Sequence, residues 1–272
     1  MKILFIGAGN MGQAIIGGIC GKMFAPNEID IYEINEATRE NVKSRFGVGS
    51  ISDLSLIKQY DFVLLALKPQ VFGGFVSQNK AVINSNFDCG KTTIITIMAG
   101  VSIDKVQSAF GGSSVNVIRV MPNTPALVGE SMSVLCGSDG ISNDRMASAQ
   151  QIFDSVGKTA IMAESYLDAV TGLSGSGPAY IYLIIEALTS GGVWAGLPKP
   201  IAQQLAVQTV KGTVAMIEKN PDKAIEDLRH AVTSPGGTTI AGLAALERHG
   251  VRNAIMEAVK DAADRSAELG KR

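Results

Sequence analysis

The sequence has few of the residues that build metal sites and hydrolytic active sites. Its two histidines, His230 and His249, lie in charged stretches with helical spacing, where we expect surface positions. A zinc site or a Ser-His-Asp triad therefore has little to be built from. The serines near residue 174 do not fit G-x-S-x-G, and Gly90-Lys91-Thr92 lacks the first glycine of a phosphate-binding P-loop. Hydrolase and NTPase functions are disfavoured, and no metal is expected.

Cysteine is also scarce. Cys20, Cys89 and Cys136 are odd in number and show no C-x-x-C spacing, which argues against a disulfide framework or a zinc knuckle and favours a reducing compartment. The apolar run after Lys2 ends at Gly7 and is too short for a signal peptide. We therefore expect a cytoplasmic protein.

Charge of one sign is not in excess. Lysine and arginine number 24 against 25 aspartates and glutamates, so the sequence offers no electrostatic footprint for nucleic acid or an anionic membrane. The one long apolar stretch, residues 179–197, is broken by Glu186 and by Gly191-Gly192, which predicts a buried helix rather than a membrane span. A helix this apolar needs a cover, and a subunit interface is the expected one.

The pattern of apolar residues divides the chain in two. Short apolar runs alternate with amphipathic segments in the first half, which predicts a parallel sheet covered by crossover helices. Beyond about residue 163 only helical spacing remains, as in Val207, Val210, Val214 and Ile217. We predict an α/β fold, with a Rossmann-type dinucleotide-binding domain over residues 1–162 and an all-helical domain over residues 163–272. The predicted strands cover residues 3–6, 29–32, 62–67, 93–98, 115–121 and 131–136.

The strongest local motif stands between the first strand and an amphipathic helix. It reads Gly7-Ala8-Gly9-Asn10-Met11-Gly12. In a dinucleotide-binding fingerprint the first glycine allows a tight turn, the second lets a pyrophosphate approach the backbone, and the third lets the helix pack closely. The helix N-terminus would face the phosphates. The alternative is a tight strand-to-helix turn without a ligand, but the position after a strand favours dinucleotide binding.

The end of the second predicted strand bears on the choice of cofactor. Glu33, Asn35 and Glu36 stand where an acidic side chain can bind the 2′-hydroxyl of NAD, which favours NADH. Arg39 or Lys43 from the next helix could instead meet the 2′-phosphate of NADP, and Glu33 or Glu36 could be solvated surface charges. The expected cofactor is NADPH or NADH.

Three further turns follow predicted strands, at the edge where open α/β sheets bind ligands. Lys68 either contacts the cofactor or substrate or is an exposed loop lysine. Asn123 and Thr124 are fixed between two prolines, where they either belong to the binding site or form a rigid interdomain corner. The turns are Ala66-Leu67-Lys68-Pro69, Met98-Ala99-Gly100 and Met121-Pro122-Asn123-Thr124-Pro125.

Two segments of the helical half combine hydroxyls with glycines next to a helix start. They are residues 171–178, Thr-Gly-Leu-Ser-Gly-Ser-Gly-Pro, and residues 233–239, Thr-Ser-Pro-Gly-Gly-Thr-Thr. Bare N–H groups and hydroxyls suit a carboxylate ligand. Helix capping by serine and threonine is the alternative for either segment alone.

Together these runs resemble the pyrroline-5-carboxylate reductase family over nearly the whole chain. The resemblance rests on the fingerprint, on residues 66–70, 120–125 and 168–180, and on Val232-Thr-Ser-Pro-Gly-Gly-Thr-Thr-Ile240. It implies NAD(P)H-dependent reduction of 1-pyrroline-5-carboxylate to L-proline, the last step of proline biosynthesis, an amino-acid biosynthesis pathway. It also implies a helical domain that dimerises, giving a homo-oligomer built from dimers. Acids at Glu33, Glu36 and Asp53 depart from the Ser, Asn or Arg typical of NADPH-using members.

The resemblance also implies roles for individual residues. The candidate catalytic residues are Thr239, whose hydroxyl would meet the imine nitrogen, Lys68 and Asn123. The backbone N–H groups of Gly236 and Gly237 would hold the substrate carboxylate, with Ser234 and Thr238 in the same binding turn. A protonated cyclic imine accepts hydride without a strong enzyme acid, so the lack of histidine fits this chemistry.

Two other functions stay open from the sequence. One is a β-hydroxyacid dehydrogenase or another imine reductase of the same two-domain plan. Hydroxyacid enzymes usually carry a catalytic lysine on the helical domain, where Lys211 is the mid-helix candidate. The other is a non-catalytic protein that senses NAD.

Overall fold

The computed structural model describes residues 1–270 and divides into two compact units. The first unit contains residues 1–176 and the C-terminal segment from Asp261, and the second contains Gly177–Lys260. The domain boundary proposed between residues 162 and 163 follows the end of the last strand, whereas the compact units divide after Ser176 because residues 167–176 pack within the first unit.

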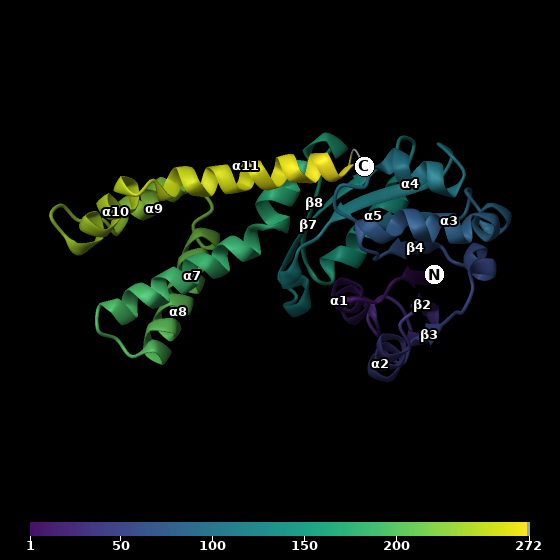
Figure 1. Cartoon of the computed structure of the whole chain (residues 1–272), viewed down its shortest axis with the longest axis horizontal. Coiled ribbons are helices and arrows are strands. Elements are labelled where there is room, and N and C mark those ends of the chain that lie inside the picture. The colour runs from purple at the N-terminus through teal and green to yellow at the C-terminus, as the bar shows by residue number, and fades with distance from the viewer. Residues whose placement is uncertain (271–272) are drawn as a thin grey trace. The chain divides into compact units, whose positions relative to one another are not determined.

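The first unit is built on a sheet of eight strands in the order β3-β2-β1-β4-β5-β6-β7-β8 (Figure 1). Neighbouring strands pair in parallel from β3 to β6, β7 runs antiparallel to β6, and β8 is parallel to β7. The strands are β1 Ile3–Ile6, β2 Ile29–Tyr32, β3 Gly49–Ser50, β4 Phe62–Leu65, β5 Thr93–Thr96, β6 Asn116–Met121, β7 Ser131–Gly137 and β8 Gly157–Ile161.

All six predicted strands are present, and β3 and β8 were missed. β3 has only two residues, and β8 is a half-exposed strand without an apolar run, so neither gives the pattern of a buried parallel strand. The predicted α/β fold with a Rossmann-type first domain is confirmed.

Helices cover both faces of the sheet (Figure 1). Because side chains alternate along a strand, Ile3 and Phe5 pack under α1, α2 and α5, whereas Leu4 and Ile6 pack under α3 and α4. Both faces are therefore apolar, as a parallel sheet requires. The helices of this unit are α1 Asn10–Ile19, α2 Glu36–Phe46, α3 Pro69–Asn86, α4 Ile103–Phe110, α5 Asn143–Asp154 and α6 Leu167–Val170, with shorter turns η1 Pro26–Glu28, η2 Leu54–Gln59, η3 Thr124–Val128, η4 Glu164–Tyr166 and η5 Thr171–Gly175.

The order of the strands fixes where a ligand can bind. From β1 the chain passes outward to β2 and β3, and then returns to β4 on the other side of β1. The connections after β1 and β4 therefore leave in opposite directions, which opens a crevice at the carboxyl ends of these two strands.

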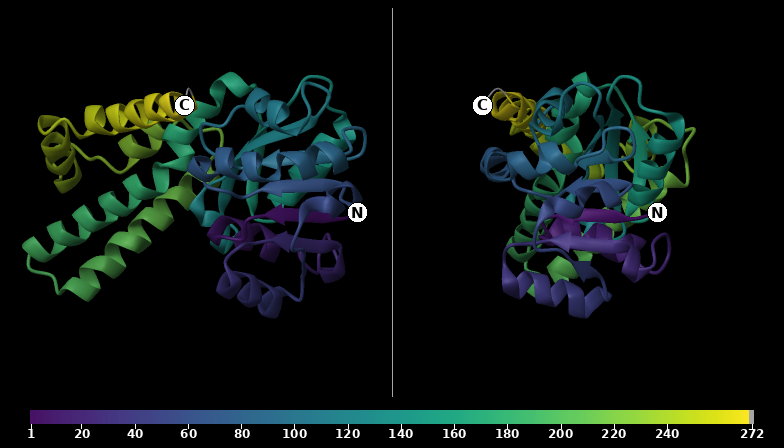
Figure 2. Two further views of the ribbon diagram at one scale, coloured as in Figure 1. Left: turned by 45° about the vertical axis from the view of Figure 1, so that its right-hand side comes forward. Right: turned by 90° about the vertical axis from the view of Figure 1, so that its right-hand side faces the viewer.

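The second unit consists of helices only, as predicted for this part of the chain. In α7 and α8, Gly192 packs against Ala202, and Ala202 and Ala206 are buried. Gly196 and Gly236 have positive φ angles of 99° and 70°, and they stand in the connections between α7 and α8 and between α9 and α10. The helices are α7 Gly177–Trp194, α8 Lys199–Glu218, α9 Ile225–Ala231, α10 Thr238–Arg248 and α11 Val251–Gly270, whose last turns belong to the first unit (Figure 2).

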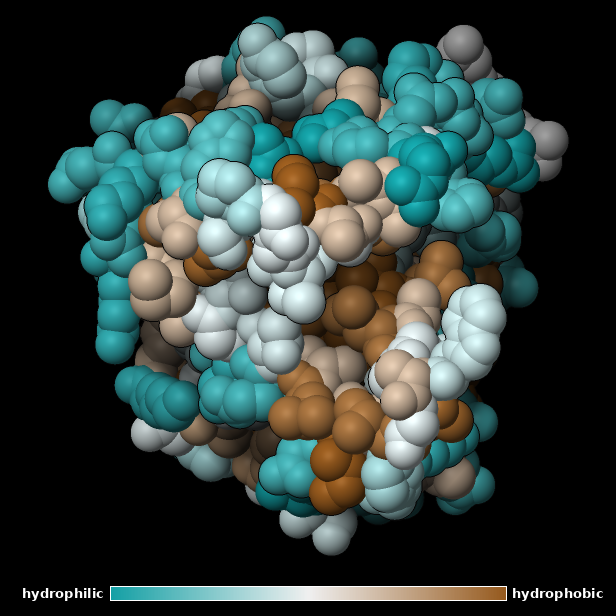
Figure 3. Space-filling view, turned by 90° about the vertical axis from the view of Figure 1, so that its left-hand side faces the viewer, coloured by the Kyte–Doolittle hydropathy of each residue, from teal (hydrophilic) through white to brown (hydrophobic). Residues whose placement is uncertain are grey.

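Helix α7 is left largely uncovered by the rest of this chain. Within the chain only Thr189 of this helix is buried, while Tyr182, Leu183 and Trp194 are 64%, 66% and 94% exposed. Apolar side chains also gather at the centre of the face shown in Figure 3. Among residues 1–270, no helix combines the length and apolar character needed to cross a bilayer. The cover expected from the sequence, a subunit interface, has to come from outside this chain.

Candidate active site

The fingerprint turn shows why two of its glycines are needed. Gly7 has φ of +89°, and a Cβ there would lie 2.8 Å from the carbonyl oxygen of Ala66. A Cβ on Gly12 would lie 3.1 Å from the carbonyl oxygen of Gly7. Side chains at these positions would push α1 away from the ends of β1 and β4, so both glycines serve the close approach of helix and sheet.

Gly9 differs from the other two glycines. A Cβ at this position would meet no atom within 4 Å, so the fold itself leaves room for a side chain. Gly9 is also the N-cap of α1, without a side-chain cap, and the first turn of the helix carries no acidic residue. The free N–H groups at a helix N-terminus attract an anion, and this open space is where a pyrophosphate would lie. The residues present fit a dinucleotide.

A hollow of about 470 Å³ extends from Gly9 toward the end of β2. Tyr32, Glu33 and Ile34 line one side of it, and Leu67 and Lys68, which follow β4, line another. One face of α3 completes the wall with Val71, Gly74, Phe75, Gln78 and Asn79. This half of the groove has the apolar lining and the size for an adenosine.

A second hollow, of about 440 Å³, extends from Gly9 in the other direction, toward β5 and β6. It shares Gly9, Ala66, Leu67 and Lys68 with the first hollow, so the two form one continuous groove. The groove crosses the sheet at the switch point described above. Its further lining comprises Asn10, Met11, Gly12, Pro69, Ile97, Met98, Ala99, Met121, Pro122, Asn123, Thr124 and Gly175.

Glu33 lines the groove, but its carboxylate already has partners. One oxygen accepts a hydrogen bond from the Ala8 N–H and the other from the Asn35 N–H, each at 2.8 Å. The Arg39 guanidinium donates to the Glu33 carbonyl oxygen at 3.2 Å and lies 3.9 Å from Glu36. Glu33 thus ties the fingerprint turn to the end of β2. A separate hollow beside it, lined by Arg39, Ser50 and Ser52 among others, offers hydroxyls that the sequence analysis did not single out.

Asn123 is held by the protein itself. Its side-chain oxygen accepts hydrogen bonds from the Ser131 hydroxyl and the Met132 N–H, and its side-chain nitrogen donates to the Ser174 carbonyl oxygen, all at 3.0 Å. Asn123 therefore fixes η3 and η5 in place at the end of the groove. One N–H of the amide is left for a ligand.

Two other predicted cofactor residues do not line the groove. The Asn35 side chain accepts from the Thr38 N–H and caps α2, the role that asparagine commonly has at this position. Gly100 is buried, with φ of +72°, and a Cβ there would lie 3.0 Å from the Ser266 carbonyl oxygen of α11. Its conformation serves packing against α11, so a direct cofactor contact through Gly100 is not what the structure shows.

The contribution of α3 was missed by the sequence analysis. Val71, Gly74, Phe75, Gln78 and Asn79 follow the spacing i, i+3, i+4, i+7 and i+8, so they share one helical face. Their mixed polarity gives no apolar period, because other apolar residues of α3, such as Phe72 and Ile83, are the ones that pack on the sheet. The sequence signal for this face was the glycine and the two amides, Gly74, Gln78 and Asn79, at helical spacing.

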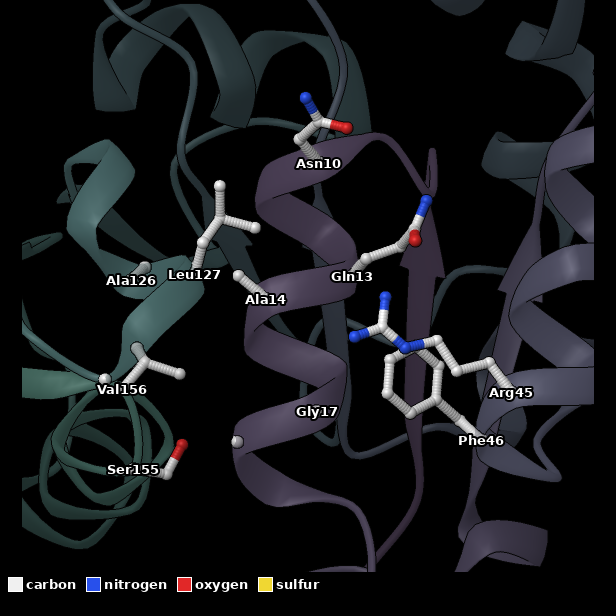
Figure 4. A pocket seen from close by; sticks show the side chains of 12 residues that line it. Asn10, Gln13, Ala14, Gly17, Arg45, Phe46, Ala126, Leu127, Ser155 and Val156 are labelled. Carbon is white, nitrogen blue, oxygen red and sulfur yellow. The ribbon is translucent and has the colours of Figure 1, made fainter. Parts of the chain in front are cut away.

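A further hollow runs along the other side of α1 (Figure 4). Gln13, Ala14 and Gly17 line it from α1, and Arg45 and Phe46 line it from the end of α2. The Arg45 guanidinium stacks over the Phe46 ring at 4.9 Å, and Gln13 donates to the Ala8 carbonyl oxygen. Apart from Asn10, it contains none of the predicted site residues.

The predicted substrate turn lies in the second unit, between α9 and α10. The Gly237 N–H donates to the Ser234 carbonyl oxygen at 3.1 Å and is therefore used in closing the turn. Gly237 is the N-cap of α10, so the N–H groups of Thr238 and Thr239 have no partner within the helix. Ser234, Gly236, Thr238 and Thr239 are exposed in the chain. The turn is an N-terminal helix site with two hydroxyls.

His230 and His249 are exposed, as expected. Within residues 1–270 no group of three or more His, Cys, Asp or Glu side chains is arranged to hold a metal ion.

Two family models match the chain. Residues 164–269 match the model described as pyrroline-5-carboxylate reductase dimerisation, and residues 2–100 match that of NADP oxidoreductase, coenzyme F420-dependent. The chain is similar to a pyrroline-5-carboxylate reductase of Synechocystis sp., with 43% identity over all of this chain and 99% of the relative. It is 42% identical to one from Arabidopsis thaliana, over 98% of this chain and 95% of the relative.

Solved structures agree with these matches. A pyrroline carboxylate reductase of Plasmodium falciparum with NADP bound has a TM-score of 0.85 and 30% identity, covering 99% of this chain and 98% of that chain. A pyrroline-5-carboxylate reductase of Coxiella burnetii has a TM-score of 0.88 and 31% identity, covering 100% of this chain and 99% of that one.

The fold and the groove define an oxidoreductase that uses a nicotinamide dinucleotide and carries a dimerisation domain. More closely, the chain belongs to the pyrroline-5-carboxylate reductase family. The family resemblance stated from the sequence is confirmed, and so is the expectation of NAD(P)H as the cofactor. The alternatives of a hydroxyacid dehydrogenase and an NAD sensor gain no support.

The open space at Gly9 gives a direct test of the groove. We expect Gly9→Val to abolish NADH and NADPH binding, because the new side chain fills the space proposed for the pyrophosphate. The melting temperature should change little, since a side chain here meets no protein atom. Fluorescence titration of the cofactor and thermal unfolding measure the two effects. Unchanged cofactor affinity would contradict the assignment.

Proposed function

We propose that this chain catalyses NAD(P)H-dependent reduction of the cyclic imine 1-pyrroline-5-carboxylate to L-proline, in proline biosynthesis. The observation that carries the proposal is the continuous groove with open space at Gly9, in a chain that has the family's characteristic runs along its whole length. The three cysteines are free, which supports a reducing compartment, and we place the enzyme in the cytoplasm.

The fingerprint residues Gly7, Gly9, Asn10, Met11 and Gly12 hold the cofactor's phosphates in this proposal. Glu33 keeps the fingerprint turn against the end of β2 and contributes to the adenosine half of the groove. The nicotinamide half is formed by Met98 and Ala99 with Asn123 and Thr124. The turns that line the middle, Ala66 to Pro69, serve both halves. The cofactor, when bound, supplies the hydride.

Lys68 is the exposed cation of the groove. It is the N-cap of α3, and Pro69 after it fixes an extended backbone. Its ammonium is therefore carried at the edge of the groove, where it can pair with phosphate or with a substrate carboxylate. We assign it to charge pairing with a ligand, without a proton-transfer role.

The turn between α9 and α10 holds the substrate in this proposal. The carboxylate of the imine binds at the N-terminus of α10, through the N–H groups of Thr238 and Thr239, together with Gly236 and the Ser234 hydroxyl. The Gly237 N–H closes the turn and so shapes this site. The Thr239 hydroxyl hydrogen-bonds the imine nitrogen. An iminium carbon accepts hydride without a proton from the enzyme, so orienting the substrate is the turn's main task.

A substrate assay tests the proposed reaction. We expect oxidation of NADPH or NADH with 1-pyrroline-5-carboxylate, followed by absorbance of the reduced cofactor and by detection of proline. We expect no turnover of 2-hydroxy acids with the oxidised cofactor, and none of keto acids with the reduced cofactor. Turnover of a hydroxyacid without turnover of the imine would favour the hydroxyacid dehydrogenase alternative, whose lysine candidate, Lys211, is exposed on α8.

Thr239 and Thr238 form a matched pair. A hydrogen bond to a charged partner contributes about 1.5–3 kcal/mol, so we expect Thr239→Ala to lower kcat/KM for the imine roughly 10- to 150-fold. Cofactor affinity should stay the same. If Thr239 has only a structural role in the first turn of α10, its loss should change the melting temperature while the kinetics stay near normal. Measuring kcat/KM and the melting temperature for Thr239→Ala and Thr238→Ala separates the two roles.

The uncovered faces of the helical unit support an assembly built from dimers. Exposed apolar side chains lie along both α7 and α8, among them Tyr182, Leu183 and Leu205. Leaving such a surface in water is unfavourable, and a second copy offers the same apolar surface for mutual burial. We expect sedimentation as a dimer or a multiple of it. An active monomer at assay concentration would contradict this.

A further inference from the structure

A buried arginine lies two residues away from the lining of the groove. Arg119 lies in β6, two residues before Met121, and is 6% exposed. Its Nη1 donates to Oε1 of Glu164 at 3.0 Å, and its Nη2 lies 3.9 Å from Oδ1 of Asp168. A buried guanidinium is costly to remove from water, even when it is paired. Neither the sheet core nor the proposed chemistry needs a charge at this point.

The two carboxylates connect Arg119 to separate parts of the first unit. Oε1 of Glu164 accepts a hydrogen bond from the N–H of Ile103, the first residue of α4, at 2.8 Å. Oδ1 of Asp168 accepts from the Ser266 hydroxyl, in the last turns of α11, at 2.6 Å. Ser266 is 3% exposed, so this hydrogen bond is shielded from water.

These connections meet again at the segment between β5 and α4. Gly100 packs so closely on α11 that a Cβ there would lie 3.0 Å from the Ser266 carbonyl oxygen and 3.2 Å from the Gly270 nitrogen. The segment is thus held by Glu164 at Ile103 and by α11 at Gly100. Met98 and Ala99, just before Gly100, line the groove.

The charged side chains of this cluster are Arg119, Glu164 and Asp168. Cys136 lies opposite Arg119 on β7, but burial raises the pKa of its thiol, and the Glu164 carboxylate adds to the effect. The thiol therefore stays neutral near neutral pH. One guanidinium shared by two carboxylates holds the two elements together, and the geometry of a guanidinium suits this bridging better than an ammonium.

We propose that Arg119 is a positioning residue for cofactor binding, which acts through Glu164, Asp168 and Ser266 to hold residues 98–103 and with them the Met98–Ala99 wall of the groove. The last turns of α11 then form part of the support for the groove. The inference depends on the use of NAD(P)H, not on the identity of the imine substrate.

The test uses the full-length protein with Ser266→Ala and Arg119→Lys. We expect hydrogen–deuterium exchange of the amides of residues 98–103 to rise in the cofactor-free protein. The dissociation constant for NADPH or NADH should rise about 3- to 10-fold in each variant, a fraction of the effect of losing a hydrogen bond to a charged group at the site itself. Titration of the cofactor measures this dissociation constant in the absence of the imine. The result therefore does not depend on whether the proposed reaction takes place.

Ser138→Ala is the matched control. Ser138 is 6% exposed and its hydroxyl accepts from the Val117 N–H, so the variant loses a similarly buried hydrogen bond at the other end of β6. We expect it to lower the melting temperature without changing exchange at residues 98–103 or the cofactor dissociation constant. The proposal is overturned if Ser266→Ala changes these two quantities no more than Ser138→Ala does, at equal loss of stability.

Discussion

The close approach of α1 to the carboxyl ends of β1 and β4 is the constraint on which the groove depends. Gly7 turns the chain with a positive φ, and Gly12 lets the helix lie against the turn. Only this approach brings the free N–H groups of α1 to the point where the strand order reverses. The same approach leaves Gly9 facing open space, unlike Gly7 and Gly12 of the same turn. The fold thus sets aside room that its own packing does not use.

Around the N-terminus of α1, polar side chains mainly form hydrogen bonds with backbone groups of the protein. Glu33 binds the N–H groups of Ala8 and Asn35, and Asn123 joins η3 to η5. A carboxylate or amide with several protein partners has a fixed orientation, so the wall it supports is fixed before a ligand arrives. Hydride transfer to an iminium requires placement of two ligands more than proton transfer. A groove stiffened by such side chains suits this requirement.

The sequence was sufficient for six of the eight strands and for the position of the groove, because both depend on local patterns. Apolar runs predicted β1, β2, β4, β5, β6 and β7, and the fingerprint located the switch point. It was insufficient where a residue's role depends on distant partners. Gly100 looked like a ligand contact after a strand, but its partner is Ser266, 166 positions later in the chain. Asn35 caps its own helix, and the α3 face was hidden by its mixed polarity. The expected burial of α7 likewise depends on surfaces outside this chain.

The C-terminal helix connects these observations. α11 begins in the helical unit and ends in the first unit, where Ser266 binds Asp168 and Gly270 packs on Gly100. Any rearrangement that moves the end of α11 must strain the pairing of Asp168 and Arg119, and through Glu164 it reaches the segment that lines the groove. The buried charges of Arg119, Glu164 and Asp168 therefore connect the end of α11 with the wall of the groove.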